Sequence, residues 1–439
     1  MQFPALSPVA ARAARGALVA IALLSVVPSP GLAAEAPLTL AEAQRLAVAR
    51  SRQLVAQDAA VTAAREMAVA AGQLPDPVAT VGINNMPVNG PDAFTLTRDF
   101  MTMTSVGVMQ EFTRREKREA RAERFEREAD KSLAERSASI AAIRRATAIA
   151  WLDRYYADAT QAVIAAQSRE AMVEVEAAEG AYRAGRGNLA DILAAKSALS
   201  MLDDRASEAR RKTQVARIAL ARWIGPAADA PLSGTPAIDA IGLDPRQLDT
   251  ELPHHPELAV LARKEQMAAA DVRLAQAARD ADWSVALMYN QRGSAYSNMV
   301  SINVSIPLQW DRKDRQNREL AAKLALLDQA RAERDDMLQS HDAEVRAMIA
   351  EWDSDRERSA RYRRELLPLA FERTQATLAA YRGAKASLTD VLAAYRSEIE
   401  VRMQALQLEM DTARLWAQLS FLAADDDGHS SPASNKGTR

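Results

Sequence analysis

The sequence contains no cysteine among its 439 residues. This absence excludes disulfides, thiolate metal sites, cysteine nucleophiles and a lipid-modified N-terminal cysteine. Glycine, with 16 residues, and aromatic residues, at 5%, are sparse, and the abundant alanine favours helices that pack closely on small side chains. The net charge is only −2, so no overall field draws the chain to nucleic acid or to an acidic membrane surface.

Motifs of enzyme chemistry are also missing from the sequence. It has no glycine-rich loop that would cradle a phosphate, no metalloprotease helix motif and no nucleophile elbow. Charged residues make up 26% of the chain, and their distribution is typical of salt-bridged helix surfaces. The sequence therefore predicts a protein that is not an enzyme, with no cofactor, no resident metal and no nucleic-acid partner.

Only one apolar run stands out, and it lies at the N-terminus. Arg12 and Arg15 precede an apolar stretch over residues 17–27, which is followed by the small-residue site of residues 31–33. We predict that residues 1–33 are a secretory signal peptide, removed after Ala33 or Ala34. The alternative is a membrane anchor, but about a dozen apolar residues are fewer than the ~20 that a spanning helix needs.

A turn pattern occurs twice in the chain, at an offset of 199 positions. Each copy has a glycine that ends a helix, followed by an N-cap residue with an aspartate three positions later. The residues are Tyr182, Arg183, Gly185, Asn188, Asp191 and Leu193 in the first copy, and Tyr381, Arg382, Gly383, Ser387, Asp390 and Leu392 in the second. All correspond at this offset except the glycines, since Gly383 lies one position early. This internal duplication predicts two helical hairpins, each made of two long antiparallel helices.

The duplicated plan divides the chain into two repeats. We expect a first repeat over 34–224, made of a helix over 38–74, a β-hairpin over 78–112, a long helix over 113–184, a tip turn and a return helix over 189–224. An equatorial linker over 225–253 follows. The second repeat, over 254–424, has a helix over 256–282, a β-hairpin over 283–310, a long helix over 312–382, a tip turn and a last helix over 388–424, before a disordered tail over 425–439. Helices of about 70 residues, roughly 105 Å long, are typical of coiled coils and helical tubes.

The predicted strands alternate between apolar and polar residues. The third strand does so along its length, and Trp283 and Tyr289 lie towards its ends. In the fourth strand the apolar residues occupy every second position and polar residues fill the positions between them; the apolar set is Ile302, Val304, Ile306, Leu308 and Trp310, and the polar set is Ser301, Asn303 and Ser305.

This alternation is typical of a lipid-facing β-barrel with aromatic girdles, but it also fits any half-buried sheet. Four strands cannot close a barrel, and open sheet edges are not tolerated in hydrocarbon. A membrane location therefore requires a barrel shared between chains. The alternative is a soluble four-stranded sheet that caps a helical body, and periodicity favours neither.

The chain resembles the TolC-type outer-membrane efflux family over residues 38–424. The resemblance lies in the order of its segments: a signal, then a hairpin, a long helix, a tip turn and a return helix, with every segment after the signal present twice. The resemblance implies a mainly α protein with a membrane β-barrel. In this family three chains share one 12-stranded barrel, and their helical hairpins form an α-barrel tunnel. It also implies a homotrimer in outer-membrane lipid with a large periplasmic portion, whose partners are a periplasmic adaptor (membrane fusion) protein and an inner-membrane RND pump.

Three segments resemble the heavy-metal cation-efflux branch of that family, which is CzcC- and CusC-like: residues 84–87, 102–112 and 115–118. This resemblance implies passive conduction of heavy-metal cations from the periplasm to the exterior. The chain departs from the branch at residues 113–116, which lack the usual Pro- or Gly-containing turn, and from the family at Ala384, where glycine is usual. The alternatives are an outer channel for drug or protein export, or an exported soluble coiled-coil scaffold or adaptor.

Asp191 and Asp390 match the acidic positions that the family places at the inner constriction of the tunnel. Three copies of each would form a ring of six carboxylates that favours cations. The alternative role is local, because each aspartate is also the third residue of a helix, where a carboxylate completes a capping box. The next lumen-facing positions hold Ala194 and Ala393, so a second acidic ring is not expected.

Further residues of the tip turns are candidates for gating or for contact with the adaptor. They are Arg183, Arg186, Asn188, Leu189, Arg382, Lys385, Ser387 and Leu388. The basic ones could pair with neighbouring chains, or they could be solvated turn residues, since isolated surface ion pairs contribute little stability.

Two other groups of residues could be metal ligands by type. Thioethers suit Cu(I), and four methionines surround the first hairpin, although methionine in an apolar strand more often serves packing; they are Met86, Met101, Met103 and Met109. His254 and His255 lack an acidic partner at ligand spacing, so we interpret them as residues at the entry of a helix.

Overall fold

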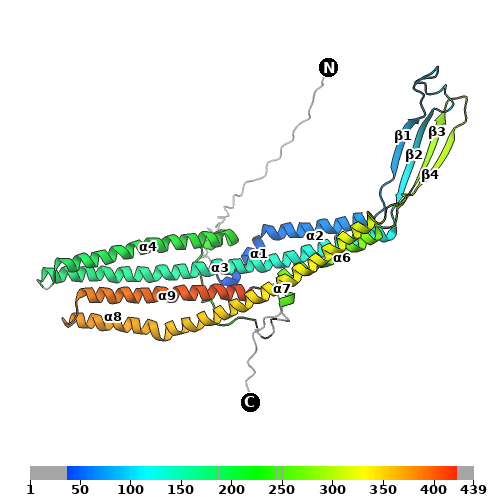
Figure 1. The fold of residues 1–439 in the computed structure, drawn as a ribbon. Coiled ribbons are helices and arrows are strands. Elements are labelled where there is room, and N and C mark those ends of the chain that lie inside the picture. Colours follow the sequence, from blue (N-terminus) through cyan, green and yellow to red (C-terminus); the bar gives the residue numbers. More distant parts are fainter. Residues whose placement is uncertain (1–36, 186, 244–245, 247, 249–251, 423–439) are drawn as a thin grey trace, which may run out of the picture.

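The computed structural model describes residues 37–422 except 186, 244–245, 247 and 249–251. The predicted signal peptide and the predicted tail lie outside the described residues. The described chain is a long helical body that continues at one end into a narrow β-sheet (Figure 1). The prediction of a mainly helical fold with long helices and a four-stranded antiparallel sheet is confirmed.

The described part of the first half contains four α-helices: α1 (Leu40–Arg50), α2 (Arg52–Ala71), α3 (Arg115–Arg183) and α4 (Leu189–Ile224). The 69 residues of α3 form one uninterrupted helix. The prediction of a single helix over 38–74 is wrong, because Ser51 has an extended backbone with ψ 114°. Its side-chain oxygen accepts a hydrogen bond from the Leu54 amide and so begins a second helix.

The second half has the helices α6 (Pro256–Ala277), α7 (Gln316–Arg361), α8 (Leu367–Arg382) and α9 (Leu388–Ser420). α6 ends before the predicted position, Asp282. The predicted helix over 312–382 is divided by a π-helical stretch, η3 (Tyr362–Leu366). Pro368 lacks the amide that an α-helix would require there, and the Leu367 amide instead bonds to the Tyr362 carbonyl five residues back.

Where the structure describes the segment between the repeats, it contains the short 3-10 helices η1 (Gly225–Asp229) and η2 (Leu252–His254). Gly225 has a φ of +70°, and a Cβ atom at this position would lie 1.6 Å from Arg50 Nη1. The same guanidinium donates to the Ile224 carbonyl at 3.3 Å. The end of α4 is thus anchored to α1 through a position that only glycine can occupy without strain.

The duplication in the sequence extends to tertiary contacts. Trp151 Nε1 donates to the Leu38 carbonyl at 3.2 Å, and Trp352 Nε1 donates to the Ile238 carbonyl at 3.2 Å. The two tryptophans are 201 positions apart (352 − 151) and the two acceptors 200 (238 − 38). Each tryptophan belongs to a buried cluster of its own, so the two repeats are built around equivalent anchors.

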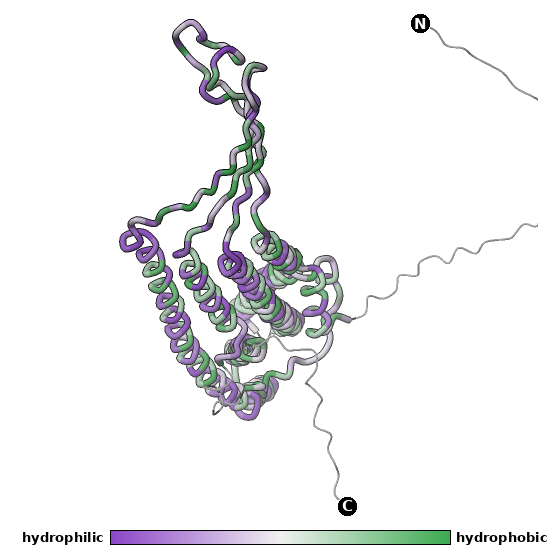
Figure 2. Tube along the Cα trace, turned by 90° about the vertical axis from the view of Figure 1, so that its right-hand side faces the viewer, coloured by the Kyte–Doolittle hydropathy of each residue, from purple (hydrophilic) through white to green (hydrophobic). Residues whose placement is uncertain are grey.

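The sheet contains β1 (Val78–Asn84), β2 (Met103–Phe112), β3 (Trp283–Arg292) and β4 (Met299–Ser305), in that order and antiparallel throughout. The predicted strand up to residue 310 ends early, at Ser305, because Pro307 cannot donate a ladder hydrogen bond. Figure 2 shows the strands extending away from the ends of the helices.

Candidate functional site

The first candidate site is the sheet, whose two faces differ in polarity. The pairing register of the strands aligns one apolar residue from each strand in a row across the sheet. One such row contains Val81, Val106, Tyr289 and Val300. The next row on the same face contains Ala79, Val108, Leu287 and Ile302. The large side chains of this face are exposed to about half or more of their area. Such an exposed patch marks a membrane or a partner surface.

The opposite face carries a chain of polar side chains. Asn84 Nδ2 donates to Ser105 Oγ at 2.6 Å, and Ser105 Oγ donates to Asn290 Oδ1 at 2.6 Å. Asn290 Nδ2 then donates to Ser301 Oγ at 2.9 Å, so the chain of hydrogen bonds crosses all four strands. This face is also closely packed, since a Cβ on Gly107 would lie 2.7 Å from Met288 Cγ. An apolar face opposite a polar one is the pattern of a membrane barrel wall.

Aromatic residues lie near both ends of the apolar face. Phe112 and Trp283 stack at the helical end, with ring centroids 4.5 Å apart. Tyr289 lies six residues further along β3, about 20 Å away at ~3.3 Å per residue, and its hydroxyl accepts a hydrogen bond from Asn298 Nδ2 at 2.7 Å. At the ~40° tilt of barrel strands this separation is about 15 Å along the membrane normal, which lies within the ~25 Å apolar band of outer-membrane barrels.

The sheet has two open edges, β1 and β4, since neither edge strand has a second partner strand within the described residues. Exposed edges of this kind are ready to pair with another chain. The junction with the helices is held by Asp282, which bonds to Lys117 Nζ at 2.5 Å and to the Arg114 amide at 3.0 Å. The direction of the sheet relative to α3 is therefore fixed by a half-buried ion pair.

The second candidate site is the pair of tip turns at the far end of the helical body. Both aspartates complete capping boxes: Asp191 accepts from the Asn188 amide at 3.2 Å, and Asp390 accepts from the Ser387 amide at 2.9 Å. The Ser387 hydroxyl and, to a smaller extent, the Ser387 backbone amide donate hydrogen bonds to Asp390 and lower the pKa of its carboxyl group. Both carboxylates thus have the local role.

The left-handed position of the two turns is occupied by different residues. Gly185 has a φ of +71°, and the equivalent residue of the second turn is Ala384, with a φ of +58°. Gly383, which directly precedes it, has a φ of −83°. The second turn therefore has a left-handed residue at the same position as the first turn, although its glycine lies one position earlier. An alanine occupies the left-handed position instead, which has a steric cost.

The tip residues differ in accessibility. Leu189 is 56% exposed, as a contact residue would be. Leu388 is only 6% exposed, because it packs with Ala178, Ile192 and Ala195 in a cluster that joins the two tips. This burial leaves Leu388 little surface for its predicted contact role. The remaining predicted tip residues are exposed, namely Arg183, Asn188, Arg382, Lys385 and Ser387, and Arg186 lies outside the described residues.

The four methionines of the first hairpin do not all lie together. Met103 and Met109 are six positions apart on β2, which corresponds to about 20 Å. Among the described residues, no group of three or more His, Cys, Asp and Glu side chains has the geometry to hold a metal ion. Within the same residues, no helix has the length and apolar character required to span a bilayer.

Sequence reasoning missed a buried histidine pair. His255, at the N-cap of α6, lies against His341 of α7, with ring centroids 4.5 Å apart. Burial, together with the neighbouring His341, lowers the pKa of His255 to about 4. The two residues are far apart in the sequence, so no local pattern could have revealed the contact.

A second missed feature is Glu174 of α3, which lines a cavity of about 60 Å³ between α3, α4 and α9. Burial, together with the like charge of Glu170, raises the pKa of Glu174 to about 7. One of its carboxylate oxygens is buried without a hydrogen-bond partner. The spacing of Glu170 and Glu174, one helical turn apart, was visible in the sequence, but the partial burial of Glu174 was not.

No protein-family model and no curated protein matches the chain. Solved structures share its fold. The outer-membrane channel OprN matches with a TM-score of 0.72 and 17% identity, over 88% of this chain and 90% of that one. The outer membrane protein VceC of Vibrio cholerae matches with a TM-score of 0.70 and 18% identity, over 87% of this chain and 95% of that one. CusC matches with a TM-score of 0.71 and 16% identity, over 87% of this chain and 91% of that one.

Proposed function

We propose that three copies of this chain form an outer-membrane efflux channel, with a shared 12-stranded barrel and a long periplasmic tunnel of helices. The observation that carries this proposal is the sheet, which has an exposed apolar face across all four strands and, on its other face, a chain of hydrogen-bonded polar side chains that crosses the same four strands. An apolar exterior and a polar lumen are what a water-filled barrel in lipid requires.

The open edges support the oligomer. In a membrane, β1 of one copy must pair with β4 of the next, because unpaired backbone groups are not tolerated in hydrocarbon. The solved structures that share the fold include proteins described as outer-membrane channels, which supports the same function here. The chain would act as a passive conduit and not as an enzyme.

At the inner end, the tips would close the tunnel and contact a periplasmic adaptor and an inner-membrane RND pump. The exposed tip residues, such as Leu189 and Lys385, would make these contacts. Asp191 and Asp390 would add a weak preference for cations while they also cap their helices.

Heavy-metal cations are the proposed substrate, on the strength of the resemblance of residues 84–87, 102–112 and 115–118 to that branch of the family. The second candidate is a channel for drugs or proteins. Deletion of the gene should raise sensitivity to metal cations and leave drug sensitivity unchanged. The reverse pattern would favour the second candidate without affecting the channel itself.

The channel is tested by extraction and conductance. The protein should remain in the outer-membrane fraction until detergent is added, run as a trimer in detergent, and give discrete conductance steps in a planar bilayer. A soluble scaffold, the competing interpretation, would be released with the periplasmic contents. A monomer in detergent that gives no conductance would refute the proposal.

A further inference from the structure

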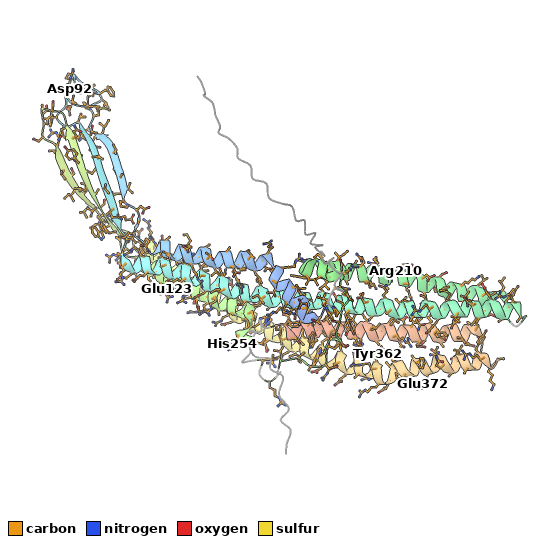
Figure 3. The ribbon with its side chains drawn as sticks, turned by 180° about the vertical axis from the view of Figure 1, so that it is seen from behind. Asp92, Glu123, Arg210, His254, Tyr362 and Glu372 are labelled. Atoms are coloured by element: carbon orange, nitrogen blue, oxygen red, sulfur yellow. The ribbon has the colours of Figure 1, made fainter. Side chains whose placement is uncertain are left out.

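The cavity of about 60 Å³ that Glu174 lines is enclosed by three helices, α3, α4 and α9. It lies on the tip side of Arg210, which Figure 3 labels on α4. Part of its wall is a buried apolar cluster with one residue from each helix, Ala171, Leu202 and Ile399. At about 10–15 Å³ for each water molecule, the cavity has room for roughly four to six of them. It can therefore hold a small organic molecule.

The polar part of the wall comes mainly from one face of α3. Gln167, Glu170 and Glu174 line the cavity at positions i, i+3 and i+7 of this helix. Gln167 is only 3% exposed, and its side chain forms no hydrogen bond within the described residues. One carboxylate oxygen of Glu174 is likewise buried without a partner. Arg205 and Arg396 also line the cavity, but both are exposed. The charge that acts most strongly on Glu174 is the like charge of Glu170.

Two unpaired polar groups beside an apolar wall define the ligand. Buried polar groups are rarely left unpaired without a reason, and an unfilled ligand position is one such reason. We propose that the cavity binds a small primary ammonium compound, whose charged group lies at Glu174 and Gln167 and whose hydrocarbon part lies against Leu202 and Ile399. An ammonium group has three N–H donors and no acceptor, and its charge is opposite to that of the Glu174 carboxylate. Met201, which is 60% exposed, also lines the cavity, so a ligand can enter from solvent.

Other classes of ligand fit this wall less well. A divalent metal ion needs several oxygen or nitrogen ligands, and the described residues provide no group of three or more His, Cys, Asp and Glu side chains that could hold one. An anion would meet the like charges of Glu170 and Glu174. A purely apolar molecule would leave the buried carboxylate oxygen unpaired, which is unfavourable.

The cavity also joins the two helical hairpins. α3 and α4 form the first hairpin, and α9 belongs to the second, so a bound ammonium compound would contact both. It would therefore oppose their separation. The binding itself does not depend on the proposed channel function.

Binding should depend on pH, because Glu174 must be ionised to attract the ammonium group. Burial, and next the charge of Glu170, raises the pKa of Glu174 to about 7, so its ionised fraction rises from about 3% at about pH 5.5 to about 97% at about pH 8.5, and the dissociation constant should fall about 30-fold. An alkylammonium group keeps its charge to about pH 10, as lysine does. On α9, burial and the charge of Glu174 raise the pKa of Tyr395, so its hydroxyl stays neutral in this range. Arg205 of α4 and Arg396 of α9 stay charged throughout.

The test is equilibrium dialysis of radiolabelled isopentylamine against the full-length protein in detergent. One molecule per chain should bind, about 30-fold more tightly at about pH 8.5 than at about pH 5.5. Isopentyl alcohol, the neutral analogue, should compete weakly and equally at both values. Glu174→Gln should lose the pH dependence and bind the amine at the higher pH as weakly as the wild type does at the lower one. Glu176→Gln is the matched control, because Glu176 is exposed on the same helix and does not line the cavity, and it should behave as the wild type.

Equal affinity of the wild type for isopentylamine at the two pH values would overturn the proposal, even if Glu174→Gln fails to fold. Unchanged binding by folded Glu174→Gln would also overturn it, as would competition by the alcohol that is as strong as competition by unlabelled amine. The absence of saturable binding at both pH values would refute the proposal and leave the cavity as a site for water only.

Discussion

Replacing Ile302 by lysine should prevent stable assembly in lipid, whereas lysine at the next residue, Asn303, should be tolerated. The two residues are neighbours on β4 but point to opposite faces of the sheet. Ile302 pairs with Leu287, which pairs with Val108 near the middle of β2. The ten residues of β2 span about 33 Å, or about 25 Å along the membrane normal at a ~40° tilt.

Ile302 would therefore lie close to the middle of the bilayer. Lysine on the lipid face at that depth costs about 2–4 kcal/mol. Three copies in a trimer bring the total to about 6–12 kcal/mol, by the same estimate. At Asn303 the lysine would face a water-filled lumen, so we expect a cost within about 0.5 kcal/mol.

Both variants would be folded into lipid vesicles, and the trimer fraction would be measured against urea concentration. The midpoint should fall strongly for Ile302→Lys and stay near the wild-type value for Asn303→Lys. Equal midpoints for the two variants would refute the assignment of lipid and lumen faces. Loss of assembly only in Asn303→Lys would show that the faces are reversed.

Three further predictions concern the helical body. Ala384→Gly should remove the steric cost of the left-handed alanine and raise the free energy of local opening in the second tip by about 1 kcal/mol, measured as slower amide exchange. Gly185→Ala should lower the free energy of local opening in the first tip by a similar amount. No change in amide exchange in either variant would refute backbone strain at this position. Glu174 has a raised pKa, so its native state holds a proton that the unfolded state loses. Stability should thus fall as pH rises from about 4.5 to 7, and Glu174→Gln should raise the melting temperature at about pH 8 but not at about pH 4.5; equal effects at both values would contradict the raised pKa. Changing Asp191 and Asp390 together to Asn should lower cation preference in single-channel recordings, while Glu at both positions should retain it; unchanged selectivity in the Asn variant would leave the aspartates only as caps.

Local chemistry made the tips predictable. Asn188 with Asp191, and Ser387 with Asp390, form the capping boxes that their spacing predicts. The bounds of α4 at Leu189 and Ile224 match the prediction as well. These elements follow from hydrogen bonds between residues only three positions apart, which a sequence records directly.

The departures arose where one residue overrides a long pattern. Ser51 divides the first helix by capping a new one, and Pro368 forces a π-turn into a stretch that is otherwise helical in character. Leu388 has the spacing of a surface residue of the tip, but the other hairpin covers it. In each case a local backbone conformation or a packing contact decides the structure, and the spacing of apolar residues in the sequence does not specify it.

The sequence by itself determined the period of each segment, the duplication, and the alternation of apolar and polar residues along the strands, because these depend on neighbours along the chain. Only the tertiary structure decided that β2 pairs with β3, how Ser105 links Asn84 to Asn290, and which histidine faces His255. Those contacts join residues up to 189 positions apart, as in the pair of Met103 and Arg292 (292 − 103). They depend on how helices and strands pack in space, and no local pattern in the chain specifies that packing.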